Sequence, residues 1–173
     1  KFLNFLGREG IGGTPFPYIE KIEINNNDDI IIIARTIKTW NLYWYSQNGS
    51  LKYTVKIPLD DLPVPPDGEF IPSLETIVTA RNNNSVYLKI DYYNKKINNP
   101  DYAMSYIWML DLNKESYTKS IRLPSTENTE GDDIPEFLGI NNADKFFFLT
   151  HLSDDTFQIM VIKDNGTVLI RSE

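Results

Sequence analysis

The residue types of a hydrolytic triad come together in the run His151-Leu152-Ser153-Asp154-Asp155. A serine nucleophile, its histidine base and an orienting aspartate must converge in space, whereas consecutive residues on a turn point apart. The run therefore does not predict a triad, and we expect His151 to end a strand. One histidine and no cysteine in 173 residues exclude thiolate catalysis, disulfides and cysteine-based zinc sites. No catalytic constellation is visible, so we predict a protein that is not an enzyme.

Two acidic loops carry the oxygen ligands that a Ca²⁺ ion would take. Neither loop has EF-hand spacing or another fixed ligand pattern, so a solvated, solubilising loop is the favoured interpretation. We therefore predict no metal site and no cofactor, with calcium as the alternative. The acidic residues are Asp60, Asp61, Asp67 and Glu69 in the first loop and Glu127, Glu130, Asp132, Asp133 and Glu136 in the second. Four of them are also candidate contacts to a partner protein: Asp60, Asp61, Asp132 and Asp133.

Aromatic side chains form 13% of the chain and admit two interpretations. In strands, wide side chains fill the space between packed sheets, which is the favoured interpretation of Trp40, Trp44 and Trp108. On a surface, the same residue types would anchor a partner, because they dominate interface energetics. The preferred anchors flank an Asn- and Lys-rich excursion at 94–101 that interrupts one repeat, and they are Tyr92, Tyr93 and Tyr102.

The charge balance constrains the kind of partner. The chain has 17 Lys and Arg residues against 24 Asp and Glu residues, a formal net charge of -7 and a pI near 4.8. A nucleic-acid binder needs a basic face to displace counterions from phosphates, so nucleic acid is a poor candidate. No apolar run approaches the roughly 20 residues needed to cross a bilayer. We therefore expect a protein partner and no transmembrane segment.

The elements that must position these residues have the two-residue period of β-strands. Ile22, Ile24 and the run 30–33 are β-branched, and apolar residues alternate with their neighbours from Trp40 to Trp44. Turn signals come at short intervals, among them the Asn-Gly pairs that typically close hairpins. No window of a dozen residues predicts a helix. The predicted fold class is all-β, built from successive hairpins.

A repeat of roughly 55 to 60 residues organises these hairpins. Ile57-Pro58 leads through an acidic loop to Ile71-Pro72, and Leu123-Pro124 leads through the second acidic loop to Ile134-Pro135. Each unit divides into four strands, which predicts a partial β-propeller of about three four-stranded antiparallel blades. A β-sandwich is the alternative, but it gives no reason for the repeated junctions. The strands are expected at 18–24, 30–38, 40–46 and 50–57, at 74–80, 85–93, 104–110 and 116–123, and at 136–140, 145–151, 156–162 and 167–171.

The predicted domain is one propeller segment over residues 1–173. Residues 1–17 are expected to form the outer strand, at 1–6, and the junction of a preceding blade. The three blades follow at 18–58, 71–124 and 135–173. A propeller closes with about 4 to 8 blades, so further sequence or a second copy is expected to complete the ring, and exposed blade flanks predict self-association. Because the chain starts at Lys1 without the pattern of a signal peptide, any export signal is expected upstream.

Phe5-Leu6-Gly7, the Gly-rich stretch 10–13 and Phe16-Pro17 resemble the junction between blades of NHL-type six-bladed propellers. Residues 43–49, which end in Asn48-Gly49, are similar to the third-strand tail and hairpin of those blades. The chain departs from NHL blades in its long junction loops and in having no acidic residue repeated at a fixed strand position. With its bias towards Asn, Lys and Ile, it also resembles the propeller lipoproteins of spirochaete envelopes.

This resemblance implies a non-enzymatic protein-binding or scaffold module of a cell-envelope lipoprotein, periplasmic or at the outer membrane. By analogy, it implies an accessory to outer-membrane protein assembly within a membrane-associated complex. Six-bladed lactonase-like enzymes hold calcium in the central channel, so the alternative is a calcium-dependent hydrolase with its site in the propeller channel. A third hypothesis is capture of a peptide by strand addition to an exposed blade edge.

Overall fold

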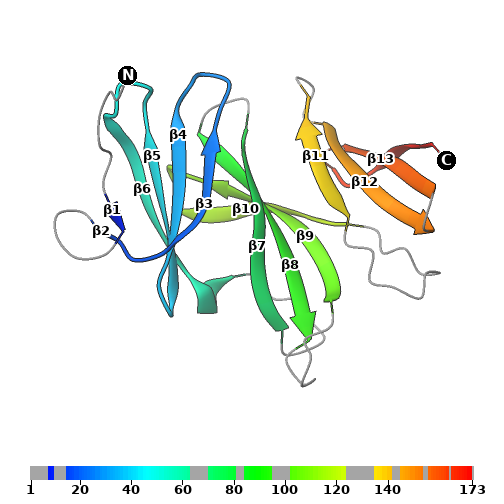
Figure 1. Cartoon of the computed structure of the whole chain (residues 1–173), viewed down its shortest axis with the longest axis horizontal. Helices are drawn as coiled ribbons and strands as arrows, with labels where there is room; N and C mark the ends of the chain where they lie inside the picture. Colours follow the sequence, from blue (N-terminus) through cyan, green and yellow to red (C-terminus); the bar gives the residue numbers. More distant parts are fainter. Residues whose placement is uncertain are drawn as a thin grey trace. The chain divides into compact units, whose positions relative to one another are not determined.

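The structure is a computed structural model, shown in Figure 1. It describes residues 8–9, 15–62, 70–80, 84–94, 102–123, 135–141, 145–153, 156–163 and 165–172. The chain divides into two compact units, Lys1–Val64 and Pro65–Glu173. Within the described residues the elements are β-strands and one short 3-10 helix, η1 (Leu59–Asp61), without any α-helix. That part of the chain accordingly offers no helix with the length and apolarity to span a bilayer.

The first unit holds a four-stranded antiparallel sheet, the first sheet, in the order β3-β4-β5-β6 (Figure 1). β-branched residues favour the extended conformation in β3 and β4, and alternating aromatic residues favour it in β5. The strands are β3 (Ile19–Ile24), β4 (Ile30–Arg35), β5 (Thr39–Tyr45) and β6 (Leu51–Pro58). A short parallel pair is formed by β1 (Arg8–Glu9) and β2 (Pro15–Phe16).

The second unit holds two further antiparallel sheets whose neighbouring strands follow chain order (Figure 1). The second sheet consists of β7 (Phe70–Thr79), β8 (Ser85–Asn94), β9 (Tyr102–Asp111) and β10 (Ser116–Arg122). The third sheet consists of β11 (Glu136–Ile140), β12 (Lys145–Ser153), β13 (Thr156–Lys163) and β14 (Val168–Ser172).

The predicted fold class is confirmed: the chain is all-β, with three four-stranded antiparallel sheets, none of which closes on itself. Each sheet runs up and down in chain order, an architecture compatible with the blades of a partial propeller and with a sandwich. His151 lies in β12, two residues before the strand ends. The outer strand predicted at residues 1–6 lies outside the described residues.

Two predicted strand boundaries are wrong by more than two residues. β4 ends at Arg35 rather than at residue 38, because Thr36 donates its backbone N–H to the Thr39 carbonyl at 2.8 Å and closes a turn. The two threonine hydroxyls, 2.7 Å apart, reinforce that turn. β7 begins at Phe70 rather than at residue 74 and runs through Pro72. Proline lacks an N–H but is tolerated there, because β7 is an edge strand of its sheet.

A β-bulge interrupts the first strand of all three sheets, and the extra residue lies three positions after a proline each time. The bulge residues are Glu20, Glu75 and Leu138, after Pro17, Pro72 and Pro135. The fourth strands carry matching bulges at Lys52, Thr118 and Leu169. The three sheets are therefore structural repeats. The expectation that no acidic residue recurs at a fixed strand position is wrong, because glutamate occupies the first-strand bulge in two of the sheets.

The core of each unit is apolar and rich in aromatic residues. In the first sheet, β5 buries Trp40, Leu42 and Trp44 on one face, each at most 1% exposed, which supports the packing interpretation of these tryptophans. In the second unit, one cluster joins the second and third sheets, where the rings of Tyr87 and Phe146 meet edge to face with centroids 4.9 Å apart. Such side chains, removed from water, supply most of the stabilisation of a sheet pair.

Candidate functional site

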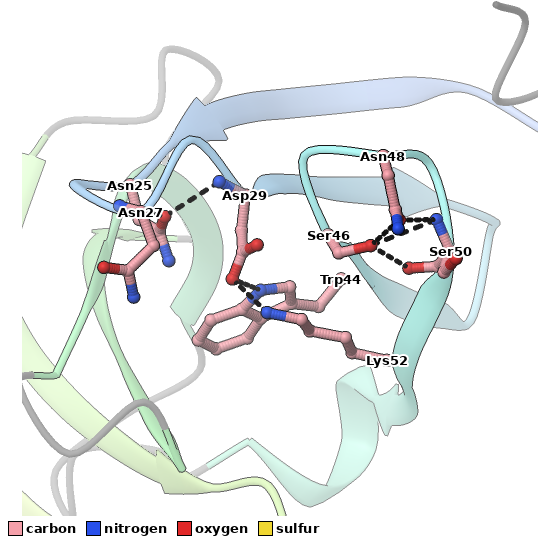
Figure 2. A network of polar contacts seen from close by, with 8 residues as sticks. All are labelled: Asn25, Asn27, Asp29, Trp44, Ser46, Asn48, Ser50 and Lys52. Carbon is pink, nitrogen blue, oxygen red and sulfur yellow. Dashed lines mark hydrogen bonds and ion pairs between the residues drawn. The ribbon is translucent and has the colours of Figure 1, made fainter.

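Two turns at one end of the first sheet bring together a polar group of residues, the hairpin-end cluster (Figure 2). One turn joins β3 to β4 and the other joins β5 to β6. Both turns lie at the same end because neighbouring strands run in opposite directions. The cluster comprises Asn25, Asn27, Asp29, Trp44, Ser46, Gln47, Asn48, Ser50 and Lys52.

Asn25 organises the first of these turns. Its Oδ1 accepts hydrogen bonds from the backbone N–H groups of Asn27 at 2.9 Å and Asp29 at 3.0 Å. Its own N–H donates to the Asp29 carbonyl at 3.0 Å. Asparagine suits this role because its side chain bonds the local backbone. These contacts fix Asp29 directly before β4.

The carboxylate of Asp29 interacts with the side chains of Lys52, Trp44 and Asn25. Its Oδ2 accepts a hydrogen bond from Trp44 Nε1 at 3.0 Å and another from Lys52 Nζ at 2.6 Å. Burial, at 3% exposure, raises the pKa of the Asp29 carboxyl, but the bonds from Lys52, Trp44 and Asn25 and the charge of Lys52 together leave the pKa below its ordinary value. Asp29 is therefore an ionised, oriented acceptor.

The second turn forms the opposite wall. Ser46 Oγ donates to Asn48 Oδ1, which also accepts the backbone N–H of Ser50 at 3.1 Å. Gly49 takes a φ of 84°, a conformation that glycine adopts without strain. Between the two turns lies an open hollow of about 550 Å³, lined by Asn27, Asp29, Ser46, Gln47, Asn48 and Lys52.

A second polar group, the buried ion cluster, lies on the second sheet and comprises Glu75, Lys89, Asp91 and Ser105. Lys89 Nζ contacts the two carboxylate oxygens of Asp91 at 2.7 and 2.9 Å. Ser105, directly opposite Asp91 on β9, donates its hydroxyl to Asp91 Oδ1. Lys89 is 4% exposed, and Asp91 and Ser105 are 0% exposed. These charges are compensated inside the protein rather than by water.

The bulge in β7 brings a further carboxylate towards this cluster. Glu75, the bulge residue, accepts a hydrogen bond from the Ser73 hydroxyl at 3.0 Å. Burial raises the pKa of the Asp91 carboxyl, and the charge of Glu75 adds to the effect, against the opposing influence of Lys89 and Ser105. A hollow of about 300 Å³ adjoins the cluster and is lined by Glu75, Thr76, Lys89, Asp91, Tyr93, Pro135, Glu136 and Phe137.

The two polar groups differ in what they can do chemically. In the buried ion cluster, the serine hydroxyl donates to a carboxylate whose two oxygens both contact one lysine ammonium group. Ser105 is 0% exposed and is not among the residues that line the adjoining hollow, so its hydroxyl is not placed to attack a substrate. The cluster therefore has the geometry of a structural ion pair. The hairpin-end cluster is open to solvent and presents hydrogen-bonding groups to a hollow, which is the geometry of a binding site.

A third feature is an exposed apolar strip on β3, the edge strip, formed by Ile22 and Ile24. Their exposed fractions are 57% and 62%, and Tyr18, which directly precedes the strand, is 59% exposed. β3 is the end strand of its sheet. In an antiparallel ladder, hydrogen-bonded and non-hydrogen-bonded residue pairs alternate. Asn25 and Asp29 form a hydrogen-bonded pair, so the pairs that Ile24 and Ile22 make with β4 are not hydrogen-bonded. The backbone N–H groups of Ile22 and Ile24 therefore point away from β4, towards the outer edge of the sheet.

The tyrosines predicted as partner anchors are not displayed together. Tyr92 is 1% exposed, its hydroxyl accepts a hydrogen bond from Trp108 Nε1 at 3.1 Å, and burial raises its pKa to about 12. The prediction of Tyr92 as a surface anchor is therefore wrong, because its ring is part of the core. Tyr93 is half-buried at the wall of the 300 Å³ hollow. Tyr102 pairs with Tyr93 in the ladder, but its side chain lies outside the described residues.

The acidic candidates are separated. Asp60 and Asp61 are exposed in η1, where Leu62 behind them is buried. Asp132 and Asp133 lie outside the described residues. Within the described ranges, no three His, Cys, Asp or Glu side chains converge closely enough to hold a metal ion.

Sequence reasoning missed both polar groups. A signal for the bulge glutamates was present, because Pro-x-x-Glu-x-Ile occurs at 17–22 and again at 72–77. The alternation Lys89-Ile90-Asp91 was a second signal, since it places two opposite charges on one face of a strand. No comparable signal linked Asp29 to Lys52, which meet across two turns.

In comparisons with known proteins, no protein-family model and no curated protein sequence matches this chain. The likeness to NHL-type propellers and to spirochaete lipoproteins therefore rests on the sequence motifs alone.

Proposed function

We propose that this chain is a non-enzymatic protein-binding module, and that its binding element is the open edge of β3. The observation that carries the proposal is the edge strip, where Ile22 and Ile24 are each more than half exposed on an end strand. An exposed edge with apolar side chains is a template for a strand from another chain. The partner is an extended segment with alternating apolar residues.

The backbone and the side chains of β3 contribute separately to this mode of binding. The outward N–H groups of Ile22 and Ile24 supply hydrogen bonds that any extended peptide can accept. The isoleucine side chains select apolar residues, because burying apolar surface away from water is favourable. Affinity and selectivity can therefore be tested with different substitutions.

A finer form of the proposal rests on the sequence resemblance. In that form the module belongs to a cell-envelope lipoprotein, periplasmic or at the outer membrane, and acts as an accessory in a membrane-associated complex that assembles outer-membrane proteins. Self-association through sheet faces or edges would complete a propeller ring. The alternative of a calcium-dependent hydrolase receives no support from the described residues, where no metal-binding group converges.

The test is selection of peptides from a displayed random library, followed by hydrogen exchange on the full chain with a selected peptide bound. Strand addition predicts that the amides of Ile22 and Ile24 become protected from exchange. Ile24→Pro, which removes one outward N–H, and the double change Ile22→Asp with Ile24→Asp should each weaken binding by about tenfold or more.

Ile37→Asp is the matched control, because Ile37 is 94% exposed in the β4–β5 turn and lies off the edge strip. This variant should bind the selected peptides as the unmodified chain does. Selected peptides that leave exchange at Ile22 and Ile24 unchanged, or that bind the double variant normally, would refute the proposal.

A further inference from the structure

The hollow between the two turns of the first sheet has hydrogen-bonding capacity that the protein itself does not use. Asp29 accepts the bonds from Trp44 and Lys52 through Oδ2, the Asn25 side chain also interacts with the carboxyl, and among the described residues no close donor to Oδ1 is seen. Figure 2 shows this second oxygen without a dashed line, turned towards the side where Ser46 and Asn48 lie. An ionised oxygen on a residue that is 3% exposed is a strong acceptor awaiting a donor.

The charges of the lining restrict what can enter. Lys52 Nζ lies 2.6 Å from Asp29 Oδ2, so the formal charges of the two groups cancel. A metal cation would meet the ammonium group of Lys52, and a phosphate or carboxylate would meet the carboxylate of Asp29. The hollow therefore favours a neutral ligand that donates to one of these groups and accepts from the other.

The remaining wall consists largely of amide side chains. Asn27 and Gln47 are exposed, and within the described part of the chain neither side chain has a hydrogen-bond partner. Each amide both donates and accepts hydrogen bonds. Alternating donors and acceptors around a charged pair match a ligand whose own groups can do both, as hydroxyl groups can.

The walls are organised before any ligand arrives. Asn25 fixes the backbone of one turn with two hydrogen bonds, and Ser46 and Asn48 bond each other in the second turn. Trp44 Nε1 and Lys52 Nζ orient the carboxylate. A pre-organised site loses less conformational entropy on binding than a mobile loop does. The volume of about 550 Å³ falls within the roughly 300 to 1,000 Å³ of small-molecule sites.

We propose that this hollow is a binding site for a neutral polyhydroxylated ligand, a sugar residue. One hydroxyl donates to Asp29 Oδ1, and an adjacent hydroxyl accepts an N–H from Lys52 Nζ. The amides of Asn27 and Gln47 bond the next hydroxyls along the ring. Neighbouring hydroxyls of a sugar stand side by side, as the Asp29 carboxylate and the Lys52 ammonium group do. The N–H and C=O of a peptide unit, in contrast, point in opposite directions. The site is independent of the edge strip on β3.

The test is a titration of the ¹⁵N-labelled full chain with glucose, galactose, mannose and N-acetylglucosamine, each to tens of millimolar. The chain has three tryptophans, and the indole N–H signal of Trp44 is assigned by its disappearance in Trp44→Phe. Because this N–H donates to Asp29, its chemical shift reports directly on the carboxylate. We expect a saturable shift of the Trp44 signal with at least one sugar and unchanged indole signals of Trp40 and Trp108.

Two variants test the assigned contacts. Asp29→Asn preserves the shape of the side chain but removes the charged acceptor, and it should weaken binding by about tenfold or more. Gln47→Ala changes an exposed turn residue that has no structural bond among the described residues, and it should weaken binding by about two- to tenfold. Asn165→Ala is the control, because it alters the corresponding turn between β13 and β14 and should leave the affinity unchanged.

Three outcomes would overturn the proposal. The first is that none of the four sugars shifts the Trp44 signal. The second is that the shift persists with the same affinity in both Asp29→Asn and Gln47→Ala. The third is that an unstructured peptide, and no sugar, produces the shift. A loss of sugar binding that leaves peptide binding at β3 intact would separate this site from the proposed protein-binding function.

Discussion

Two lysine–aspartate ion pairs of nearly equal length lie in opposite surroundings in this protein. The Lys52–Asp29 contact measures 2.6 Å and the Lys89–Asp91 contact 2.7 Å. The Lys52 side chain is 42% exposed, whereas that of Lys89 is 4% exposed. The pKa of the Asp29 carboxyl is lowered from its ordinary value, and that of Asp91 is raised.

The difference comes from the neighbours of each carboxylate rather than from the pair itself. For Asp29, burial raises the pKa, but the bonds from Lys52, Trp44 and Asn25 and the charge of Lys52 together outweigh that effect. Asp91 has a hydroxyl and an ammonium donor but lies deeper, beside the charge of Glu75. Among the described residues, the first pair leaves Asp29 Oδ1 without a close donor, whereas both carboxylate oxygens of Asp91 are bonded. An ion pair marks a binding site when it retains unused bonding capacity.

The structural repeat shows that the first sheet has the same strand pairing without a buried ion pair at the corresponding position. In each of the first two sheets, the residue after the bulge pairs with one residue of the second strand. That second-strand residue is Lys89 in the second sheet and Ile33, which is fully buried, in the first sheet. The bulge glutamate of the first sheet, Glu20, meets Arg35 at 3.6 Å. In the second sheet, the position that corresponds to Arg35 is occupied by Asp91, so the bulge glutamate Glu75 lies near a second carboxylate instead of a cation. The first and second sheets thus share their strand pairing but differ in the charged residues around the first-strand bulge.

The largest expected contrast comes from removing each lysine. Lys89→Met leaves Asp91 buried without its cation and should lower the free energy of unfolding by about 3 to 5 kcal/mol. Lys52→Met should cost less, because the Lys52 side chain is partly exposed to solvent and Trp44 Nε1 still donates to Asp29. Urea unfolding of both variants measures the contrast. Equal losses would show that the two pairs do not differ as described.

Replacing both partners should separate the pairs again. In Lys89→Met with Asp91→Leu, no uncompensated charge remains, so about 2 to 4 kcal/mol of the loss seen in Lys89→Met should be recovered. Lys52→Met with Asp29→Leu should show no recovery, because Trp44 Nε1 then loses its acceptor. A double-mutant cycle at each site gives the result, and recovery at both sites would contradict it.

The pH dependence of stability should have opposite signs for the two aspartates. The depressed pKa of Asp29 gives stability that is present above its ordinary value of 3.8 and lost as pH falls through the folded-state pKa. The raised pKa of Asp91 gives stability that is complete below 3.8 and lost as pH rises through its folded-state pKa.

Denaturant midpoints measured across acid pH in Asp29→Asn and Asp91→Asn check these signs. Asp29→Asn should flatten the loss of stability below pH 3.8, and Asp91→Asn should flatten the loss above pH 3.8. Flattening on the same side of pH 3.8 in both variants would be inconsistent with the surroundings described for the two groups.

The smallest effects are expected at turns that the two units share. Asn48 Oδ1 accepts the N–H of Ser50 at 3.1 Å, and Asn165 Oδ1 accepts that of Thr167 at 3.0 Å. Asn48→Ala and Asn165→Ala should therefore each cost about 0.5 to 1.5 kcal/mol. Thermal unfolding compares them, and a cost at one turn with none at the other would argue against equivalent hairpins.

Much of the fold could be predicted from local patterns. The Asn-Gly turns at Asn48-Gly49 and Asn165-Gly166 were predicted from residue types, and the glycines adopt φ values of 84° and 83°. Alternation along β5 predicted a strand that buries Trp40 and Trp44. Local signals suffice here because hairpins are closed by neighbouring residues.

The binding features depend on contacts that local patterns do not encode. Asp29 and Lys52 are 23 positions apart and meet because two turns share one end of a sheet. Tyr92 was predicted to be exposed, but β8 is buried on both faces from Ser85 to Tyr92, so alternation could not assign an outer side. β4 ends early because Thr36 bonds Thr39, a pairing of side chains and backbone within one turn.

The contrast between the two ion pairs is tested most directly by following the side-chain carboxyl ¹³C signals of Asp29 and Asp91 in one pH titration of the full chain. The account predicts that Asp29 titrates below the ordinary aspartate value of 3.8 and Asp91 above it. Titration of the two carboxyls in the reverse order, or at the same pH, would contradict the account.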